Sequence, residues 1–373
     1  MAKLLTPRLL RRGFEIFFLA SLIGFGALLY YSNNLGAFLA AIPRIQWLWI
    51  LAGLGLASMD WIGGGLRLWV LAREIHPNPS FKGLILAGGM GAWASYLTPL
   101  QSGNAPVTIY TMKRFGIPVP IALTLVLMSF VATVAFFGIA GPIAIAFGAG
   151  RSLGQHGVVL GISLYDLFLA SLGIFLVLFG ALILLVIWPK ALHAVLRWII
   201  GFVGRRSTKV AARLEHLERG IDEARDAMAK FNTPRGWLAL LWATIISGPS
   251  HANKLLSGYV ALRAIGIEAN FTDVLLLQTL ITFLLYFFAP TPGGSGIAEL
   301  LSAAVMSIYV PRPLTALYTL IWRMIISYFT IIFGSLVFSH WVRQGLKGVE
   351  EDGDSVSLRP GRPEPTFERN VSP

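Results

Sequence analysis

Residues 291–296 read Thr-Pro-Gly-Gly-Ser-Gly and stop an apolar run, Val274–Phe288, that would otherwise predict an ordinary membrane helix. Residues 98–103 read Thr-Pro-Leu-Gln-Ser-Gly and stop a second apolar run, Leu84–Leu97. Proline removes a backbone donor and glycine tolerates positive φ, so each T-P-x-x-S-G motif predicts a helix break at membrane depth. A broken helix exposes polar backbone groups, which are tolerated there only inside protein or beside a watery cavity.

The two motifs lie 193 positions apart, and the same offset superimposes a later pair of proline motifs. Ile-Pro-Val-Pro at 117–120 corresponds to Val-Pro-Arg-Pro at 310–313. Shared residues at this many proline and glycine positions predict an internal duplication. We place repeat one at about 45–147 and repeat two at about 237–343.

The composition is that of a chain embedded in a lipid bilayer. Hydrophobic residues make up 55% of the chain, charged residues only 13%, and the mean hydropathy is +0.70, whereas soluble proteins are about 25% charged. The basic residues gather between apolar segments, so the net charge of +12 predicts cytoplasmic loops rather than a nucleic-acid surface. The chain has no cysteine, which excludes disulfides and thiolate metal sites.

Length separates the apolar segments into full spans and short limbs, because about 20 helical residues are needed to cross the hydrocarbon core. Leu84–Leu97 and Ala105–Met112 are short and predict a re-entrant hairpin around the first motif. Val274–Phe288 and Ile297–Tyr309 predict another hairpin around the second motif. Six segments predict full spans: 14–31, 47–69, 121–147, 160–187, 237–262 and 314–341.

The predicted fold is therefore an all-α integral membrane protein with about six full spans and two re-entrant hairpins. Three spans separate the hairpins, so the second hairpin is turned upside down and the two copies form an inverted repeat. The basic segments predict a multi-pass protein of the cytoplasmic (inner) membrane with both termini in the cytoplasm. The membrane domain is expected to cover 1–349, with a cytoplasmic amphipathic helix at about 205–231 and a disordered tail at 350–373.

Ionisable side chains at membrane depth cost at least a few kcal/mol each, so each one needs a physical reason. Asp60 predicts an ion or proton site, or a buried partner for a neighbouring cation such as Arg67. Glu299 lies in the first turn of the second hairpin's return helix, where a carboxylate suits the helix dipole. Arg323 lies mid-span and is expected either to pair with a carboxylate such as Glu299 or to bind a lipid phosphate. Lys254 is a further candidate charge partner.

Motifs for catalysis, metal binding or cofactor binding are not recognisable in the sequence. The chain contains neither HExxH nor a phosphate-binding P-loop. The glycine run at 63–65 lies within a predicted membrane helix rather than after a strand, and the glycines at 88, 89 and 91 are expected to allow close helix packing. We therefore predict no catalytic residues, no metal and no cofactor, and a protein that is not itself an enzyme.

Around these motifs the chain resembles the lysylphosphatidylglycerol synthase transmembrane-region family, also called flippase-like domain proteins. The similarity rests on residues 98–106 with Ile109-Tyr110, on residues 288–299 and on Trp322-Arg323. The resemblance implies a membrane protein that moves lipids or lipid-linked head groups between leaflets. Two-domain members carry a soluble aminoacyl-transferase domain after the membrane part, and the resemblance here covers the membrane part, roughly residues 10–345.

The leading interpretation is a lipid translocase with a mid-membrane site between the two hairpins, acting on an anionic membrane phospholipid. The alternatives are an ion-coupled transporter of a small solute and a membrane scaffold for a separate lipid-modifying synthase, and a nucleic-acid partner is not expected. Backbone amides freed at the two motifs are expected to bind the phosphate together with an arginine. The candidate translocation residues are Pro99, Ser102, Gly103, Tyr110, Pro292, Gly293, Gly294, Ser295, Gly296, Glu299 and Arg323, and the candidate coupling groups or charge partners are Asp60, Arg67 and Lys254.

Overall fold

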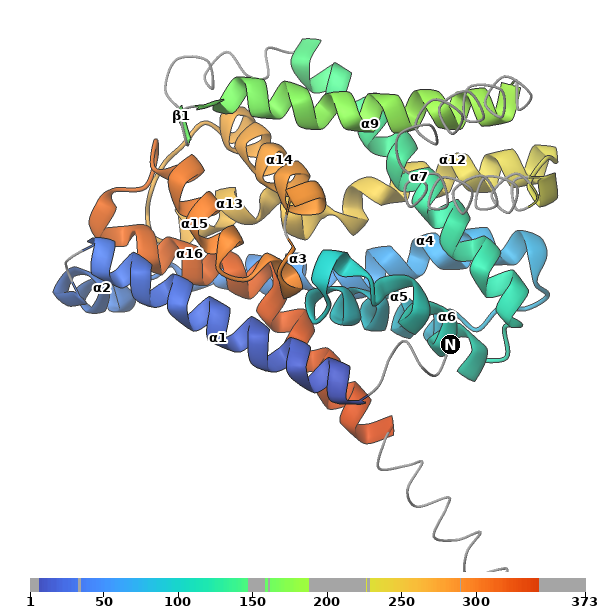
Figure 1. Cartoon of the computed structure of the whole chain (residues 1–373), viewed down its shortest axis with the longest axis horizontal. Coiled ribbons are helices and arrows are strands. Elements are labelled where there is room, and N and C mark those ends of the chain that lie inside the picture. The colour runs from blue at the N-terminus through green and yellow to red at the C-terminus, as the bar shows by residue number, and fades with distance from the viewer. Residues whose placement is uncertain are drawn as a thin grey trace, which may run out of the picture. The chain divides into compact units, whose positions relative to one another are not determined.

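The computed structural model describes residues 7–32, 35–146, 158–159, 162–187, 226, 229–288 and 290–341. These residues are almost entirely helical, which confirms the predicted all-α class (Figure 1). The helices are α1 (Pro7–Ser32), α2 (Leu35–Ala41), α3 (Trp47–Ala57), α4 (Met59–Ile75), α5 (Phe81–Tyr96), α6 (Asn104–Arg114), α7 (Val119–Ala146), α9 (Leu164–Ile187), α12 (Pro234–Ser250), α13 (Ala252–Ala264), α14 (Phe271–Phe288), α15 (Ile297–Met306) and α16 (Thr315–Arg323). Shorter elements are the 3-10 turns η1 (Ile42–Arg44), η2 (Pro99–Gln101), η3 (Pro292–Gly294) and η4 (Arg312–Leu314), the π-helical segment η5 (Met324–Tyr328), and the strands β1 (Val158–Val159) and β2 (Ile162–Ser163).

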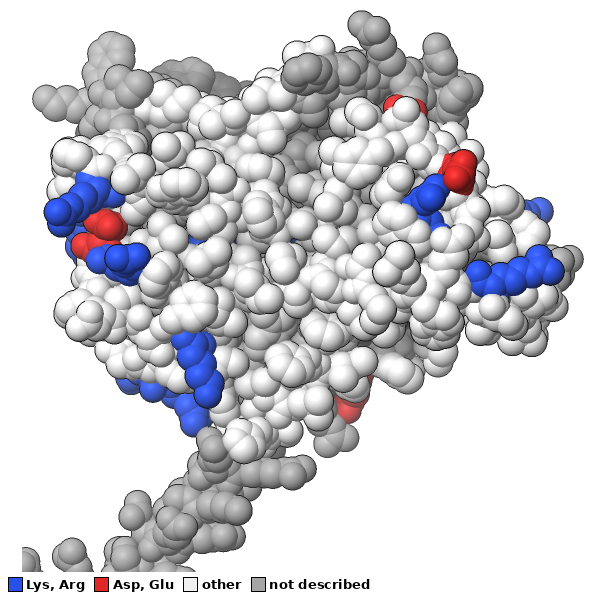
Figure 2. All heavy atoms as spheres, turned by 180° about the vertical axis from the view of Figure 1, so that it is seen from behind, with Lys and Arg blue, Asp and Glu red and all other residues white. Residues whose placement is uncertain are grey.

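The outer surface has the character of a protein that faces lipid. Four helical stretches among the described residues are long and apolar enough to cross a bilayer: Arg12–Tyr30, Trp47–Ile75, Val119–Ile143 and Arg312–Trp341. On the face drawn in Figure 2, charged side chains gather near two opposite edges and leave a broad, nearly uncharged band between them. A contiguous apolar surface of this kind marks contact with a membrane. The chain divides into a large unit, Met1–Ile331, and a C-terminal unit, Ile332–Pro373, whose described part continues as helix through residue 341.

Both T-P-x-x-S-G motifs fold into the same kind of turn, which confirms the predicted helix breaks. The two variable positions have left-handed backbone in each copy. They are Leu100 (φ 51°) and Gln101 (φ 56°) in η2, and Gly293 (φ 57°) and Gly294 (φ 66°) in η3. Glycine adopts this conformation freely, whereas leucine and glutamine store about 1–2 kcal/mol of strain per residue. The first turn is therefore the strained copy of the two.

Two segments predicted as full spans, 47–69 and 237–262, are each interrupted by a helix break that was not predicted. The breaks fall at Ser58, between α3 and α4, and at His251, between α12 and α13. These two positions are again 193 apart. Pro249 accounts for the second break, because it removes a donor from the last turn of α12. At the first break, the Ser58 hydroxyl donates to a carbonyl three residues earlier at 2.6 Å, and such bonds bend helices.

By the 193-position offset, α3 corresponds to α12 and α4 corresponds to α13. Each of these helices packs on the counterpart of its neighbour: α4 packs on α12, and α3 packs on α13. The two equivalent turns, η2 and η3, pack on each other. In Figure 1 the α5–α6 hairpin extends to the right of the junction between these turns, and α14–α15 extends to its left. The expectation that the glycines at 88, 89 and 91 permit close packing is confirmed, because a methyl group at Gly88 would lie 2.5 Å from the backbone nitrogen of Gly65. Gly63 permits a similar approach, since a methyl group there would lie 2.6 Å from the Cα atom of Ser250.

Each hairpin has its own hydrophobic core. One cluster surrounds the second hairpin and includes Phe137, Phe283 and Trp322. The other surrounds the first hairpin and includes Leu84 and Met112. Most of the predicted amphipathic helix at 205–231, and the whole tail at 350–373, lie outside the described residues.

Candidate functional site

A cavity of about 550 Å³, called the central cavity from here on, opens beside the first T-P-x-x-S-G turn. Its volume is in the range of small-molecule sites, about 300–1,000 Å³. A smaller cavity of about 60 Å³ lies against the second turn, and it shares the lining residues Tyr96, Gln101, Lys254 and Tyr286 with the central cavity. The two turns are close neighbours, because a Cβ atom added at Gly293 would lie 2.9 Å from the carbonyl oxygen of Tyr96. The polar side chains that line the central cavity include Asp60, Arg67, Gln101, Ser102, Thr133 and Lys254.

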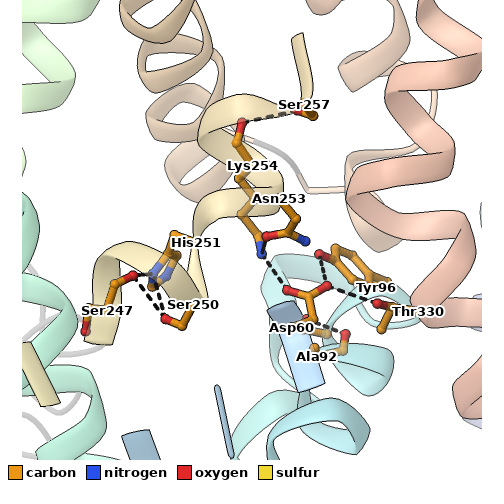
Figure 3. A network of polar contacts seen from close by, with 11 residues as sticks. Asp60, Ala92, Tyr96, Ser247, Ser250, His251, Asn253, Lys254, Ser257 and Thr330 are labelled. Atoms are coloured by element: carbon orange, nitrogen blue, oxygen red, sulfur yellow. Dashed lines mark hydrogen bonds and ion pairs between the residues drawn. The ribbon is translucent and has the colours of Figure 1, made fainter. Parts of the chain in front are cut away.

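Asp60 lines the central cavity and is the centre of a polar cluster (Figure 3), whose members Tyr96 and Lys254 line both cavities. The carboxylate is buried, and the Lys254 ammonium lies 2.9 Å from its Oδ1 atom. The Tyr96 and Thr330 hydroxyls donate to Oδ2 at 2.9 and 3.1 Å. The expected cation partner of Asp60 is therefore Lys254 rather than Arg67. The cluster joins α4, α5, α13 and the helical stretch Arg312–Trp341, which carries Thr330, around one compensated charge.

Arg67 is the cation of the central cavity without an acidic partner in the part of the chain that the structure describes. One terminal nitrogen donates to the Thr133 hydroxyl at 2.6 Å and to the Ser247 hydroxyl at 3.2 Å. Each hydroxyl in turn donates to a carbonyl one turn back in its own helix, which fixes its orientation. The Nε atom of Arg67 is buried and has no hydrogen-bond partner. The guanidinium is thus held by neutral groups while its positive charge stays uncompensated.

Arg323 and Glu299 form a fully buried ion pair beneath the second turn. Arg323 Nε donates to Glu299 Oε1 at 2.8 Å, and both side chains are at most 1% exposed. The other carboxylate oxygen accepts the backbone N–H of Gly296 at 2.7 Å, and Ser21 on α1 donates to Oε1 at 3.0 Å. A terminal nitrogen of Arg323 donates to the Gly293 carbonyl at 3.1 Å. The pair therefore ties the second turn, α1, α15 and α16 together.

The backbone amides expected to be free at the two motifs are all occupied, so that expectation was wrong. The Ser102 and Ser295 amides donate to the proline carbonyls of their own turns at 3.1 and 3.0 Å. The Gly103 amide donates to the Thr98 hydroxyl at 2.8 Å. The Gly296 amide is taken by Glu299, as described above. A proline-led 3-10 turn closes on itself, which is why the break leaves no donor for a ligand at these positions.

Of the remaining predicted site residues, some line one of the two cavities, some are buried inside the second turn, and some lie on the protein surface. Ser102 lines the central cavity, and Gly293 and Gly294 line the smaller one. Pro292 and Ser295 are buried within the second turn. Tyr110 is 56% exposed and lines neither cavity, because its helix turns Ile109 and Thr111 inward instead. Pro99 is likewise exposed.

Neutral residues supply most of what sequence reasoning missed. Tyr96 and Thr330 complete the Asp60 cluster, and Thr133 and Ser247 hold Arg67. Hydroxyl side chains are common in membrane helices, so they give no signal on their own. Gln101 is different: it stands inside the first motif at a position where the second motif has glycine, and it lines both cavities.

The helical fold, the lipid-facing surface and the buried charge clusters together define a polytopic α-helical membrane protein. The family described as the Lysylphosphatidylglycerol synthase TM region matches residues 16–334, and this chain belongs to that family. A UPF0104 membrane protein of Archaeoglobus fulgidus is 25% identical over 298 residues, which cover 80% of this chain and 88% of the relative. The family resemblance predicted from the two hairpin motifs is confirmed.

Proposed function

We propose that this chain is a lipid translocase that passes the head group of an anionic phospholipid through the central cavity while the acyl chains stay in the bilayer. The proposal is carried by one observation: Arg67 presents an uncompensated positive charge to a cavity at membrane depth. An arginine at the centre of a membrane helix costs about 2.5–3.5 kcal/mol on insertion scales. An anionic ligand that enters the cavity supplies the missing counter-charge.

The chemistry of the cavity suits a phosphate. A guanidinium presents a planar fork that matches phosphate oxygens with two parallel hydrogen bonds. The Nε atom of Arg67 is buried without a hydrogen-bond partner, so the protein itself leaves part of this guanidinium unsatisfied. The charged residues that line the cavity are Arg67, Lys254 and Asp60, so their formal charges sum to one positive charge. The Ser102 hydroxyl and the first turn of α6, at Asn104, line the same space and add donors suited to an anion.

In this proposal Glu299 and Arg323 support the site rather than bind the lipid. Their charges neutralise each other, and Arg323 is only 1% exposed. They lock the second turn, against which the smaller cavity closes. The protein then works by changing the positions of the two hairpins, without a catalytic step, metal or cofactor of its own.

We further propose that the two hairpins are re-entrant and dip into the inner membrane from opposite sides, within about six spans and with both termini in the cytoplasm. The exchanged packing of α3, α4, α12 and α13 supports this inverted arrangement. The absence of native cysteine makes a direct test simple. Single cysteines at Arg114 and Ser307, which are equivalent ends of the two hairpins, should be labelled by an impermeant maleimide from opposite sides. Labelling of both from one side refutes the inversion.

Transport is tested in proteoliposomes that carry fluorescent phosphatidylglycerol, with a membrane-impermeant quencher reporting the lipid that reaches the outer leaflet. The parent protein should move the lipid, and Arg67→Met should slow the movement at least tenfold, because one uncompensated charge contact with the phosphate is lost, about 1.5–3 kcal/mol. Arg263→Met is the matched control, since Arg263 pairs with the exposed Glu268 instead. Equal rates for Arg67→Met and the parent contradict the proposal.

A second candidate function is an ion-coupled transporter of a small solute, and the Asp60–Lys254 pair is the observation that favours it. A compensated buried pair between two cavities is an arrangement that a coupling ion or proton can open. Saturable binding of a water-soluble ligand, unaffected by added phospholipid, supports this candidate over lipid transport. The third alternative is a scaffold for a lipid-modifying synthase. It predicts that the parent protein moves no lipid or solute in these assays, while the synthase still co-purifies with it.

A further inference from the structure

A groove of about 380 Å³ lies between α4 and α12 and shares no lining residue with the central cavity. One end of the groove carries charged side chains and the other is apolar. Its lining residues are Val70, Arg73, Glu74, Arg235, Leu238, Ala239, Trp242 and Ile246. The outward-facing Leu238 and Trp242 are 53% and 51% exposed, so the groove is open on its side.

The groove lies between two antiparallel helices that pack closely on each other. The α4 backbone at Gly63 lies against Ser250 near the end of α12. Val70 lies seven residues further along α4, about 10 Å away at 1.5 Å per residue. On the α12 side the groove is lined by Ala239, which is buried but small. The small side chain leaves the space between the helices unfilled.

The positions of the groove residues along α4 and α12 match the thickness of one membrane leaflet. Gly63 lies near the middle of the apolar stretch Trp47–Ile75. Arg73 lies ten residues beyond Gly63, or about 15 Å, which is half the roughly 30 Å hydrocarbon core. Trp242 lies seven residues into α12 from Arg235, about 10 Å below it. The arginines are thus at head-group depth and the aromatic side chain at acyl-chain depth.

The charges at the head-group end favour an anion. Arg73 and Arg235 are cations, and Glu74 is the carboxylate among the groove's lining residues, so the formal sum is one positive charge. The Arg73 guanidinium lies 4.8 Å from the Trp69 ring centroid, a cation–π contact that holds it at the rim.

We propose that this groove binds one glycerophospholipid from the surrounding leaflet. Its phosphate lies between Arg73 and Arg235, and an acyl chain lies along Leu238, Trp242 and Ile246. Charge complementarity at the rim and the apolar lining below it are both met by a phospholipid, whereas a free phosphate uses only the rim. The site is separate from the proposed transport cavity and does not depend on it.

The test uses the full-length protein, delipidated in detergent and titrated with phosphatidylglycerol, with bound lipid counted by native mass spectrometry. The variant Arg73→Gln/Arg235→Gln should bind one lipid roughly thirtyfold more weakly than the parent, given the usual contribution of each basic residue at a lipid surface. The variant Arg263→Gln/Arg312→Gln removes the same charge elsewhere on the surface and should leave binding unchanged. An unchanged melting temperature confirms that both variants are folded.

Three outcomes overturn the proposal. In the first, the Arg73/Arg235 variant binds as many lipids, as tightly, as the parent. In the second, both double variants lose binding equally, which shows a general charge effect. In the third, inorganic phosphate at the lipid concentration displaces the lipid from the parent, which shows a free-anion site. The Arg67→Met variant should keep this lipid, so failure here and failure of the transport proposal are told apart.

Discussion

Replacing Glu299 by glutamine is expected to destabilise the protein far more than the same change in an exposed ion pair. Glu299 is fully buried and accepts three hydrogen bonds, from Arg323 at 2.8 Å, Gly296 at 2.7 Å and Ser21 at 3.0 Å. Without the carboxylate, the Arg323 charge stays buried with no counter-charge. Breaking a buried pair in this way costs about 3–5 kcal/mol. The glutamine amide also turns a donor toward groups that need an acceptor.

The free energy of unfolding in mixed micelles, measured by denaturant titration, checks this prediction. Glu268→Gln is the matched control, because Glu268 pairs with Arg263 at 3.2 Å while its side chain is 88% exposed. Screened surface pairs contribute about 0.2–1 kcal/mol. Adding Arg323→Met to Glu299→Gln should recover part of the loss, since the orphaned charge is gone. Equal losses for Glu299→Gln and Glu268→Gln refute the reasoning.

The other predictions concern the turn and the Asp60 cluster, and the same unfolding titration measures them. Gly293→Ala should destabilise by at least 1 kcal/mol, because positive φ strains alanine and the new Cβ meets the Tyr96 carbonyl oxygen. Leu100→Gly should raise the free energy of unfolding or leave it unchanged, since it relieves the same strain in the first turn. A decrease of more than 1 kcal/mol in the free energy of unfolding contradicts this expectation. Lys254→Met should cost about 3 kcal/mol or more by orphaning Asp60, and the double variant with Asp60→Asn should regain most of it. A purely additive double variant shows that the pair is not coupled.

Much of the fold was predictable because proline and glycine act locally. The two T-P-x-x-S-G motifs predicted helix breaks, and the structure has matching left-handed positions in both turns. The breaks at Ser58 and His251 were missed, since hydropathy averages over a window and does not register one turn residue inside an apolar run. The 193-position offset predicts their equivalence once one of them is known.

The candidate site was less predictable, because charge partners are chosen by tertiary packing. Glu299 and Arg323 are near in sequence, and their pairing followed from that. Asp60 and Lys254 are distant in sequence and come together only through the contact of α4 with α13. Arg67 was expected as a partner of a carboxylate, whereas its contacts are two hydroxyls from α7 and α12.

The most direct test of the central claim is whether a phospholipid head group occupies the central cavity beside Arg67. A single cysteine at Ser102, in an otherwise cysteine-free chain, reports access to the cavity through its rate of labelling by a charged maleimide. Phosphatidylglycerol should slow the labelling, diacylglycerol without a phosphate should not, and Arg67→Met should abolish the protection. Labelling that phosphatidylglycerol and diacylglycerol slow to the same extent, or that neither slows, contradicts a phosphate site in this cavity.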